Sequence, residues 1–233
     1  MHTLAAVVCS LLIALCVGTV EAAPPNVPVT VAMQKSGSEA TLLGMFFHDH
    51  QLGWAVGSGG TILKTTDGGH KWKKISSGTS SLLTAVYFRD AQRGWVVGAN
   101  GTVRSSKDGG ETWSVVVVST QAPLYGIAFA SQTKGWLVGG NGTILQTTDG
   151  GENWTDQASG TSAALYAIAL TSELQGTVVG ALGTILTTAD GGKTWTTQVS
   201  QSSATFFVVF FADEAIGWAV GNAGALFQTT DGG

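Results

Sequence analysis

The sequence predicts an all-β protein in which one unit of four short antiparallel strands is repeated five times. The first observation is an Asp-Gly-Gly turn that recurs once every 41 residues, with its aspartates at Asp67, Asp108, Asp149, Asp190 and Asp231. The second is a Gly-Trp pair that keeps the same step, although Gly176-Thr177 occupies its fourth position. The third is a series of strand-length apolar runs between glycine-rich turns. A fixed period of this size indicates a repeat architecture, and such units are typical of β-propeller blades.

The second repeat shows how each strand is recognised. Residues 82–88 form a nearly continuous apolar run, as expected of a strand that is buried on both faces. After a polar turn, residues 94–98 predict a second strand, and Asn100-Gly101 predicts a type I′ hairpin turn. A third strand at 102–106 leads into the Asp-Gly-Gly turn, and a fourth follows at 113–118. Tetratricopeptide and armadillo repeats are disfavoured because helical periodicity is lacking, and a WD40 propeller because no Trp-Asp pair occurs.

The same reading divides the chain into five blades, the last of which lacks a fourth strand. The blades are expected at about residues 41–76, 82–118, 124–157, 165–198 and 206–233. Residues 29–33 align with the missing strand, so we expect them to pair with the last blade and close a five-bladed ring, since an open propeller leaves unpaired strand edges. The alternative is a fragment of a longer, seven-bladed protein.

Each Asp-Gly-Gly turn belongs to a longer pattern, Ser/Thr-x-Asp-x-Gly-x-x-Trp, which we call the Asp box. The carboxylate can accept hydrogen bonds from nearby backbone N–H groups, and glycine adopts positive φ without steric cost, so the box predicts a tight hairpin turn. The tryptophan that follows the turn supplies an apolar plug. Identical residues repeated around a ring do not converge on one point, so we interpret the five aspartates as structural rather than catalytic. The accompanying tryptophans are Trp72, Trp113, Trp154 and Trp195.

Composition fits a folded domain rich in strands and turns. The chain has 233 residues, 33 glycines, 11% charged residues and a formal net charge of −4, which fits neither disorder nor nucleic-acid binding. Residues 1–22 resemble a signal peptide, because an apolar run at 4–20 is followed by the cleavage-like Val20-Glu21-Ala22. We therefore expect an exported protein (secreted, periplasmic or in the thylakoid lumen) with a linker at 23–28 and the propeller at 29–233. Cys9 and Cys16 fall within the predicted signal, so the mature protein would contain no cysteine.

The candidate binding face consists of the turns between second and third strands, which a propeller places beside the connections between blades. Small polar residues dominate these loops and offer hydrogen bonds to a peptide or a sugar, but they supply no acid, base or nucleophile. No cofactor or metal is predicted: Gly57-Ser58-Gly59-Gly60 lacks the lysine of a phosphate loop, and the Asp in His48-Asp49-His50 is explained by a turn. The candidate binding residues are Ser58, Asn100, Asn141 and Asn222, and the possible N-glycosylation sites are Asn100, Asn141 and Asn153.

Over residues 41–233 the repeated units, of the form Gly-Trp-x-Val-Gly…Gly-Thr-Ile-Leu-x-Thr-Thr-Asp-Gly-Gly-x-x-Trp, resemble the Ycf48/Hcf136-like photosystem II assembly factors, which are Asp-box (BNR-type) β-propellers. The resemblance implies a non-enzymatic scaffold outside the cytoplasm that binds a protein partner, namely a membrane-protein assembly intermediate. Asp boxes also occur in sialidases, so a glycoside hydrolase or a carbohydrate-binding propeller is the alternative. Sialidases bind the carboxylate of their substrate with three arginines from different blades. In this chain the three arginines, Arg89, Arg93 and Arg104, all fall in blade two.

Overall fold

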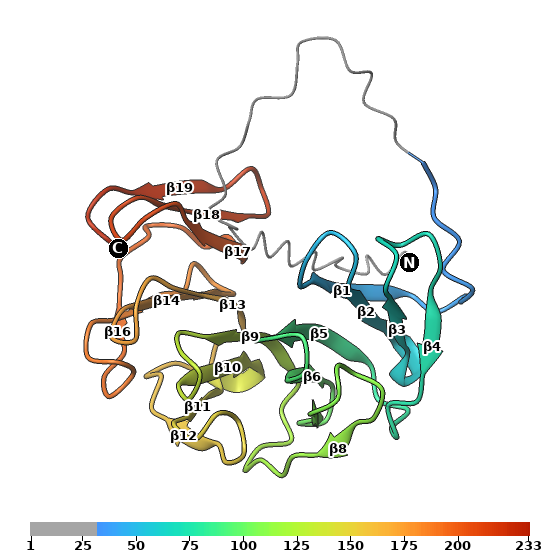
Figure 1. Ribbon diagram of the computed structural model, residues 1–233. Helices are drawn as coiled ribbons and strands as arrows, with labels where there is room; N and C mark the ends of the chain where they lie inside the picture. The colour runs from blue at the N-terminus through green and yellow to red at the C-terminus, as the bar shows by residue number, and fades with distance from the viewer. Residues whose placement is uncertain (1–31) are drawn as a thin grey trace, which may run out of the picture.

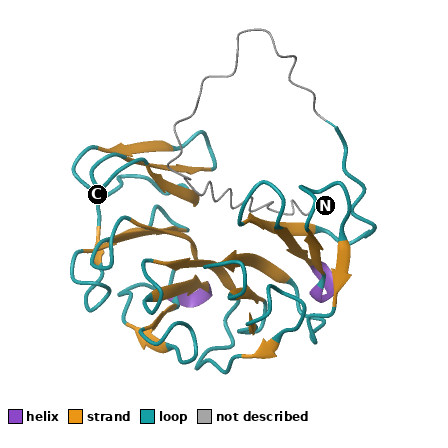
Figure 2. Ribbon diagram, in the orientation of Figure 1, coloured by secondary structure: helices purple, strands orange, loops and turns teal. Residues whose placement is uncertain are grey.

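The computed structural model describes residues 32–233, which consist almost entirely of strands, turns and loops. In that part of the chain, helix is limited to two short 3-10 turns, η1 (Ser58–Gly60) and η2 (Gly140–Gly142), drawn in purple in Figure 2. The predicted signal peptide, the linker and residues 29–31 of the predicted closing strand lie outside the described residues. No helix in residues 32–233 is long and apolar enough to span a membrane.

The strands form five antiparallel sheets in which consecutive strands pair. Blade one contains β1 (Leu42–Phe47), β2 (Gly53–Gly57), β3 (Ile62–Thr65) and β4 (Lys73–Ile75). Blade two contains β5 (Leu83–Phe88), β6 (Gly94–Gly98), β7 (Val103–Ser106) and β8 (Ser114–Val115). Blade three contains β9 (Leu124–Phe129), β10 (Gly135–Gly139), β11 (Ile144–Thr147) and β12 (Thr155–Gln157). Blade four contains β13 (Leu165–Leu170), β14 (Gly176–Gly180), β15 (Ile185–Thr188) and β16 (Thr196–Thr197). Blade five contains β17 (Phe206–Phe211), β18 (Gly217–Gly221) and β19 (Leu226–Thr229).

The sheets follow one another in chain order around a common axis, as Figure 1 shows. The first strand of each blade lies innermost, where β1 contacts β5, β5 contacts β9, β9 contacts β13 and β13 contacts β17. The later strands of each blade extend outward from this inner ring. The predicted all-β propeller fold is therefore confirmed for the described residues.

Every innermost strand has a β-bulge near its start. In blade one, Leu42 pairs with Gly57 and Gly44 pairs with Val56, so Leu43 has no partner on the second strand. A Cβ atom on Gly57 would lie only 2.0 Å from the carbonyl oxygen of Thr41, so glycine is needed where the two backbones approach here. The same irregularity recurs in all five blades. The bulged residues are Leu43, Thr84, Tyr125, Tyr166 and Phe207.

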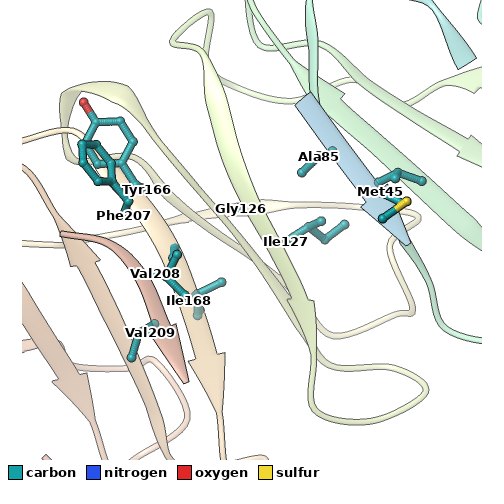
Figure 3. Close-up of a pocket in the computed structure, with 12 residues that line it drawn as sticks. Met45, Ala85, Gly126, Ile127, Tyr166, Ile168, Phe207, Val208 and Val209 are labelled. Atoms are coloured by element: carbon teal, nitrogen blue, oxygen red, sulfur yellow. The ribbon is translucent and has the colours of Figure 1, made fainter. Parts of the chain in front are cut away.

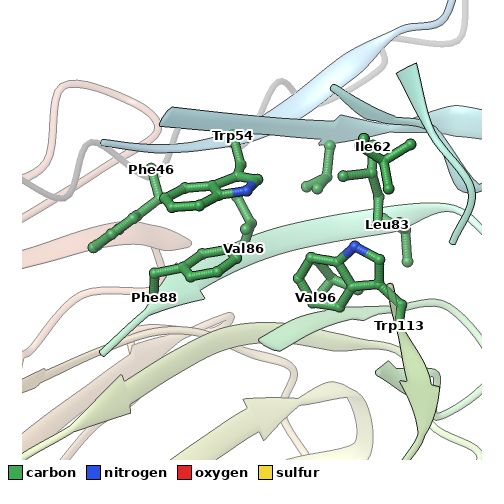
Figure 4. Packing of buried hydrophobic residues seen from close by; sticks show 10 residues of the cluster. Phe46, Trp54, Ile62, Leu83, Val86, Phe88, Val96 and Trp113 are labelled. Carbon is green, nitrogen blue, oxygen red and sulfur yellow. The ribbon is translucent and has the colours of Figure 1, made fainter. Parts of the chain in front are cut away.

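The hydrophobic core lies between neighbouring blades. Figure 4 shows the cluster shared by blades one and two, in which the indole of Trp54 stacks on Phe88 with a centroid distance of 3.4 Å and an interplanar angle of 8°. The ring of Trp113 contacts Phe88 edge-on, with a centroid distance of 5.8 Å. An equivalent pair, Trp95 and Phe129, stacks between blades two and three, and the later interfaces bury mainly aliphatic side chains, so burial of apolar area between blades holds the ring together.

Blade five has three strands in the described part of the chain, as expected from the sequence. Ala32 and Met33, the described end of the predicted closing strand, are not in a strand, and Met33 is 96% exposed. Closure of the ring by residues 29–33 and the alternative of a longer, seven-bladed protein both stay predictions.

Candidate functional site

The Asp boxes form hydrogen-bonded latches at the turn between third and fourth strands. In blade three, the Thr147 hydroxyl donates to Asp149 Oδ1 at 2.8 Å and accepts the backbone N–H of Gly151 at 2.8 Å. Asp149 Oδ1 also accepts the backbone N–H groups of Glu152 and Asn153, at 3.1 Å and 3.0 Å. The carboxylate and the hydroxyl thus satisfy most of the polar groups that the tight turn leaves without backbone partners. Since third and fourth strands lie outermost, the boxes stand away from the axis of the ring.

The hydrogen bonds of the boxes keep their carboxylates ionised. Donation from the Thr112 side chain and backbone lowers the pKa of Asp108 to about 2. A hydrogen bond from the backbone of Asn153 lowers the pKa of Asp149 to about 2. A hydrogen bond from the Thr194 side chain lowers the pKa of Asp190 to about 2 as well. The pKa values of Asp67 and Asp231 are lowered by the same kind of contact. Carboxylates in this state accept hydrogen bonds and do not act as general acids at neutral pH.

The tryptophans divide between two packing roles. Trp54, Trp95 and Trp136 of the second strands lie against the glycines of the next blade's box. Trp54 Nε1 also donates to the carbonyl oxygen of Gly109 at 3.2 Å. Those of the boxes pack within their own blade, where Trp113 and Trp154 are buried and Trp72 and Trp195 are half-buried. Neither set presents a free ring for sugar stacking in blades one to three.

The central channel is lined by side chains from all five innermost strands (Figure 3). The innermost ring consists of apolar residues at the same place in each repeat: Met45, Val86, Ile127, Ile168 and Val209. Residues 32–233 place no carboxylate, imidazole or hydroxyl nucleophile among the residues that line this part of the channel, apart from the phenol of Tyr166.

One end of the channel opens into a wider pocket of about 460 Å³ beside His48 and Arg89. Arg89 is held by Asp90 at 3.3 Å and by the carbonyl oxygen of Gln132, and its guanidinium lies 5.8 Å from the Trp95 ring centroid. The Arg89 guanidinium is therefore engaged by groups of the protein itself. No group of metal-ligating residues occurs in the described chain. Asp49, between the two histidines of the sequence motif, accepts the backbone N–H groups of its own turn at 2.7 Å and 2.8 Å.

The opposite end of the channel carries the four candidate binding residues. The turns at Asn100 and Asn141 have positive φ at both central positions, which confirms the predicted type I′ geometry at Asn100-Gly101. Ser58 Oγ accepts the backbone N–H of Thr41, and Asn222 Oδ1 accepts that of Thr205, so these two side chains tie the turn to the connection that precedes the blade. Asn100 and Asn141 are exposed at the turn tips. None of the four lines the channel pocket.

The three glycosylation motifs differ in whether the asparagine side-chain amide is hydrogen-bonded within the protein. Asn153 is exposed, but its Nδ2 donates to Asp149 Oδ2 at 2.8 Å, so the box holds this side chain. Asn100 and Asn141 stand at exposed turn tips. Glycosylation at any of the three positions stays a prediction.

Sequence reasoning missed a cluster of aromatic residues at the bulges of the innermost strands. Tyr125 and Tyr166 have ring centroids 5.1 Å apart, and Tyr166 and Phe207 are 5.6 Å apart. These three side chains come from blades three, four and five and are all partly exposed. The available signal was the 41-residue step that separates them, which sequence reasoning applied only to the boxes and the Gly-Trp pairs.

Comparison with known families identifies the repeats. The profile described as Photosynthesis system II assembly factor YCF48 matches residues 29–123, 112–161 and 155–233. A comparison with curated proteins finds no match.

Similar solved structures agree with the propeller fold. YCF48 from Cyanidioschyzon merolae is 22% identical with a TM-score of 0.66, over 83% of this chain and 68% of that one. A structure of YCF48 bound to D1 peptide is 18% identical with a TM-score of 0.48, over 85% and 95%. The Niastella koreensis GH74 enzyme is 16% identical with a TM-score of 0.65, but this chain covers only 37% of its length.

At these identities the solved structures show the fold alone, whereas the profile matches extend over residues 29–233. The chain therefore belongs to the photosystem II assembly factor YCF48 family.

Proposed function

We propose that this protein is a non-enzymatic assembly factor that binds a protein subunit of photosystem II while the complex is being built. The observation that carries the proposal is the match of the YCF48 profile to the repeats from residue 29 to residue 233. A ring of similar blades gives a rigid scaffold, on which the unrepeated residues are free to recognise a partner.

The electrostatics of the carboxylates support a binding role over glycoside hydrolysis. Hydrolysis of a glycosidic bond requires a general acid whose pKa is raised, set across the substrate from a second carboxylate. The outer groove between blades two and three does hold Asp108 and Glu152. Hydrogen bonding holds the pKa of Asp108 near 2, and Lys107, followed by Arg93, lowers that of Glu152. Both groups are thus suited to ion pairing and not to proton donation.

The arginines give a second argument against a sialidase-like activity. Arg93 pairs with Glu152 at 3.1 Å, and Arg104 donates to the carbonyl oxygen of Gly78 at 2.7 Å. Arg89 is held by Asp90. With all three guanidiniums in blade two and each occupied, the chain lacks a clamp of arginines converging from several blades on a substrate carboxylate.

Export is part of the proposal. The apolar run at residues 4–20 and the cleavage-like Val20-Glu21-Ala22 support delivery across a membrane. In a photosynthetic host the destination would be the thylakoid lumen or periplasm, where the exported segments of a photosystem II subunit are accessible.

Binding to a defined probe and turnover of glycans separate the two functions. Immobilised protein without the first 22 residues is tested against a D1 peptide, the ligand named for one YCF48 structure, and against detergent-solubilised photosystem II reaction-centre subunits. In parallel, a fluorogenic sialoside and xyloglucan are offered as substrates. Saturable binding of the reaction-centre subunits without glycan turnover is the expected result. Turnover of either glycan, or failure to bind any photosystem II subunit, would overturn the proposal.

A further inference from the structure

Except for the segment that leads into blade one, the loops of one face of the propeller contain no charged residue. That segment joins the same face through the hydrogen bond from Thr41 N to Ser58 Oγ, and it carries the exposed Lys35 and Glu39. Backbone hydrogen bonds join the turns between second and third strands to the connections between blades, as from Gly101 N to Ala122 O at 3.1 Å and from Gly142 N to Ala163 O at 2.9 Å. We call these loops together the uncharged face. Its turns are residues 58–60, 99–101, 140–142, 181–183 and 222–224, and its connections are residues 76–81, 119–123, 159–164 and 200–204. The Arg104 guanidinium reaches this face from β7, in the outer half of its blade, where it is bound by Gly78 O.

The opposite end of the ring is rich in charged residues. The turns between first and second strands carry Asp49, Asp90, Lys134, Glu173 and Asp213, among other charged residues. The Asp boxes also belong to this end, because they connect third to fourth strands in the antiparallel order. Charged residues are therefore concentrated at this end of the channel. A partner that docks on the uncharged face beside blades three to five meets few ions, because Lys35 and Glu39 belong to the segment that leads into blade one.

The β-bulges place aromatic rings at the mouth of the channel on the uncharged face. Tyr125, Tyr166 and Phe207, which we call the aromatic wall, lie one residue after the start of β9, β13 and β17, next to the connections between blades. A bulge turns the side chain of its extra residue away from the regular alternation of the strand. Thr84 at the same position in blade two instead uses its hydroxyl to bind the carbonyl oxygen of Leu124 at 2.5 Å. The wall thus occupies the arc from blade three to blade five.

The dimensions of the mouth limit what it accepts. Below the wall, the apolar channel has a volume of about 60 Å³, whereas an apolar cavity that binds benzene has a volume of about 150 Å³. An aliphatic side-chain tip fits this space, and an indole does not. The rings of the wall are inclined to one another by 39° and 54°. They curve around the mouth and form no common plane on which the flat face of a sugar ring would stack.

We propose that the aromatic wall and the channel mouth bind an uncharged segment of a partner polypeptide, with one aliphatic side chain inserted toward Met45 and Ile168. The lack of charge favours this occupant, because an acidic or basic segment would lose hydration on the uncharged face without gaining a counter-ion. The backbone groups and hydroxyls of the surrounding turns supply hydrogen bonds to a peptide backbone. The inference rests on the proposed function for the identity of the partner, a photosystem II subunit.

The first experiment locates the site without any variant. The protein, with labelled Tyr and Phe rings, is titrated by NMR with capped Ala-Leu-Ala, and separately with Ala-Glu-Ala, Ala-Lys-Ala and cellobiose. The leucine peptide is expected to shift the ring signals of Tyr125, Tyr166 and Phe207, with an affinity about tenfold or more above that of the charged peptides, as an unpaired charge at a desolvated site costs more than one decade of binding. Equal or stronger binding of a charged peptide or of cellobiose, or shifts confined to other rings, would overturn the inference.

The second experiment uses variants and the photosystem II partner. The double variant Tyr166→Ala/Phe207→Ala is compared with Phe210→Ala, a matched control in the same strand β17 but at the opposite end of the channel. Loss of binding to the reaction-centre subunits in the double variant alone supports the inference. If the double variant binds them as the wild type does, the docking site is wrong and the proposed function stands. If the wild type binds no subunit but the leucine peptide still shifts the wall, the proposed function fails and the peptide site stands.

Discussion

At the scale of single residues, the Ser or Thr hydroxyl of an Asp box holds the turn by hydrogen bonds, as the carboxylate does. Thr147 Oγ1 accepts the buried backbone N–H of Gly151 and donates to Asp149 in the same turn. Ser106 makes the equivalent pair of bonds in blade two, at 2.8 Å to both Asp108 and Gly110. Serine in blade two therefore makes the same bonds as threonine in blade three without the methyl group.

The first prediction concerns this hydroxyl. Thr147→Val keeps the shape of the side chain but leaves the buried N–H of Gly151 without an acceptor, so we expect a loss of about 1–3 kcal/mol in the free energy of unfolding. Thr147→Ser keeps the hydroxyl and serves as the control, with a change below about 0.5 kcal/mol expected. Urea denaturation monitored by tryptophan fluorescence measures both. Equal stability of the two variants would show that the latch contributes nothing.

The second prediction concerns the acid limb of the stability curve. The folded pKa of Asp108, Asp149 and Asp190 is about 2, and that of an aspartate in an unfolded chain is about 3.9. Depressed folded values mean that the unfolded state binds more protons between these limits, so the contribution of each box is complete above pH 4 and is lost as the pH falls through 2. Denaturation midpoints measured from pH 2.5 to 5 should therefore rise with pH, and less steeply for Asp149→Asn. Thr196→Ser, at an exposed position in β16 outside the boxes, changes no ionisable group and is the control, which should retain the wild-type slope.

At the scale of elements, the turns between second and third strands all need two residues with positive φ. Asn100 and Asn141 meet this need well, because asparagine tolerates the left-handed region. Blade four instead places Leu182 there at φ 56°, with its side chain 76% exposed. A leucine in this conformation is strained and gains no burial in return.

The third prediction follows from that strain. Leu182→Asn should raise the free energy of unfolding by about 1 kcal/mol, the order of the left-handed penalty that asparagine largely escapes. Leu174→Asn is the matched control, since Leu174 is also exposed, at 56%, but does not have positive φ. Thermal melting of both variants tests the difference. A stabilised Leu174→Asn would attribute the gain to removal of surface apolar area and not to the turn.

The strands themselves were predictable to different degrees. The second strands agree with the sequence, because their flanking glycines mark both ends: residues 94–98 were expected, and β6 is Gly94–Gly98. The fourth strand of blade two was expected over 113–118 but covers only Ser114–Val115, because an outermost strand has a single neighbour and its pairing ends early. The bulges at Tyr125 and Tyr166 were not foreseen. A continuous apolar run carries no alternation, so its register cannot be derived from its sequence.

At the scale of the whole molecule, the ring was predictable because one repeat length fixes one structural unit. The candidate site was less predictable than the ring, because it forms where unlike residues from several blades meet around the axis. Tyr125, Tyr166 and Phe207 are separated by full repeats in sequence, and only the ring brings their side chains to one mouth. The binding-face loops were identified from their place in the repeat. The apolar channel below them depends on which side chains of the innermost strands point inward, and the sequence left that orientation open.

Interfaces between blades are the other property of the whole ring, and one of them is incompletely filled. Trp54, Trp95 and Trp136 are almost fully buried against the next blade, and Trp95 stacks on Phe129 at 4.4 Å. At the equivalent position of blade four the smaller Thr177 faces a cavity of about 190 Å³, which is also lined by Phe211 and Gly233. This pocket is open to solvent, and the side chains that line it lack the contacts that an indole supplies at the other interfaces.

The last prediction is that Thr177→Trp fills this cavity and strengthens the docking of blade five on blade four. An indole there would stack toward Phe211, as Trp54 does on Phe88, and we expect a gain of about 1 kcal/mol, which is usual for cavity filling. Val117→Trp adds the same side chain at a position that is 85% exposed, and it should change little. Differential scanning calorimetry and amide exchange in β17–β19 measure the effect, because repeats that contact only their neighbours transmit stability through each interface. A lower melting temperature with faster exchange in blade five would mean that the cavity is too small for the ring and that overpacking outweighs burial.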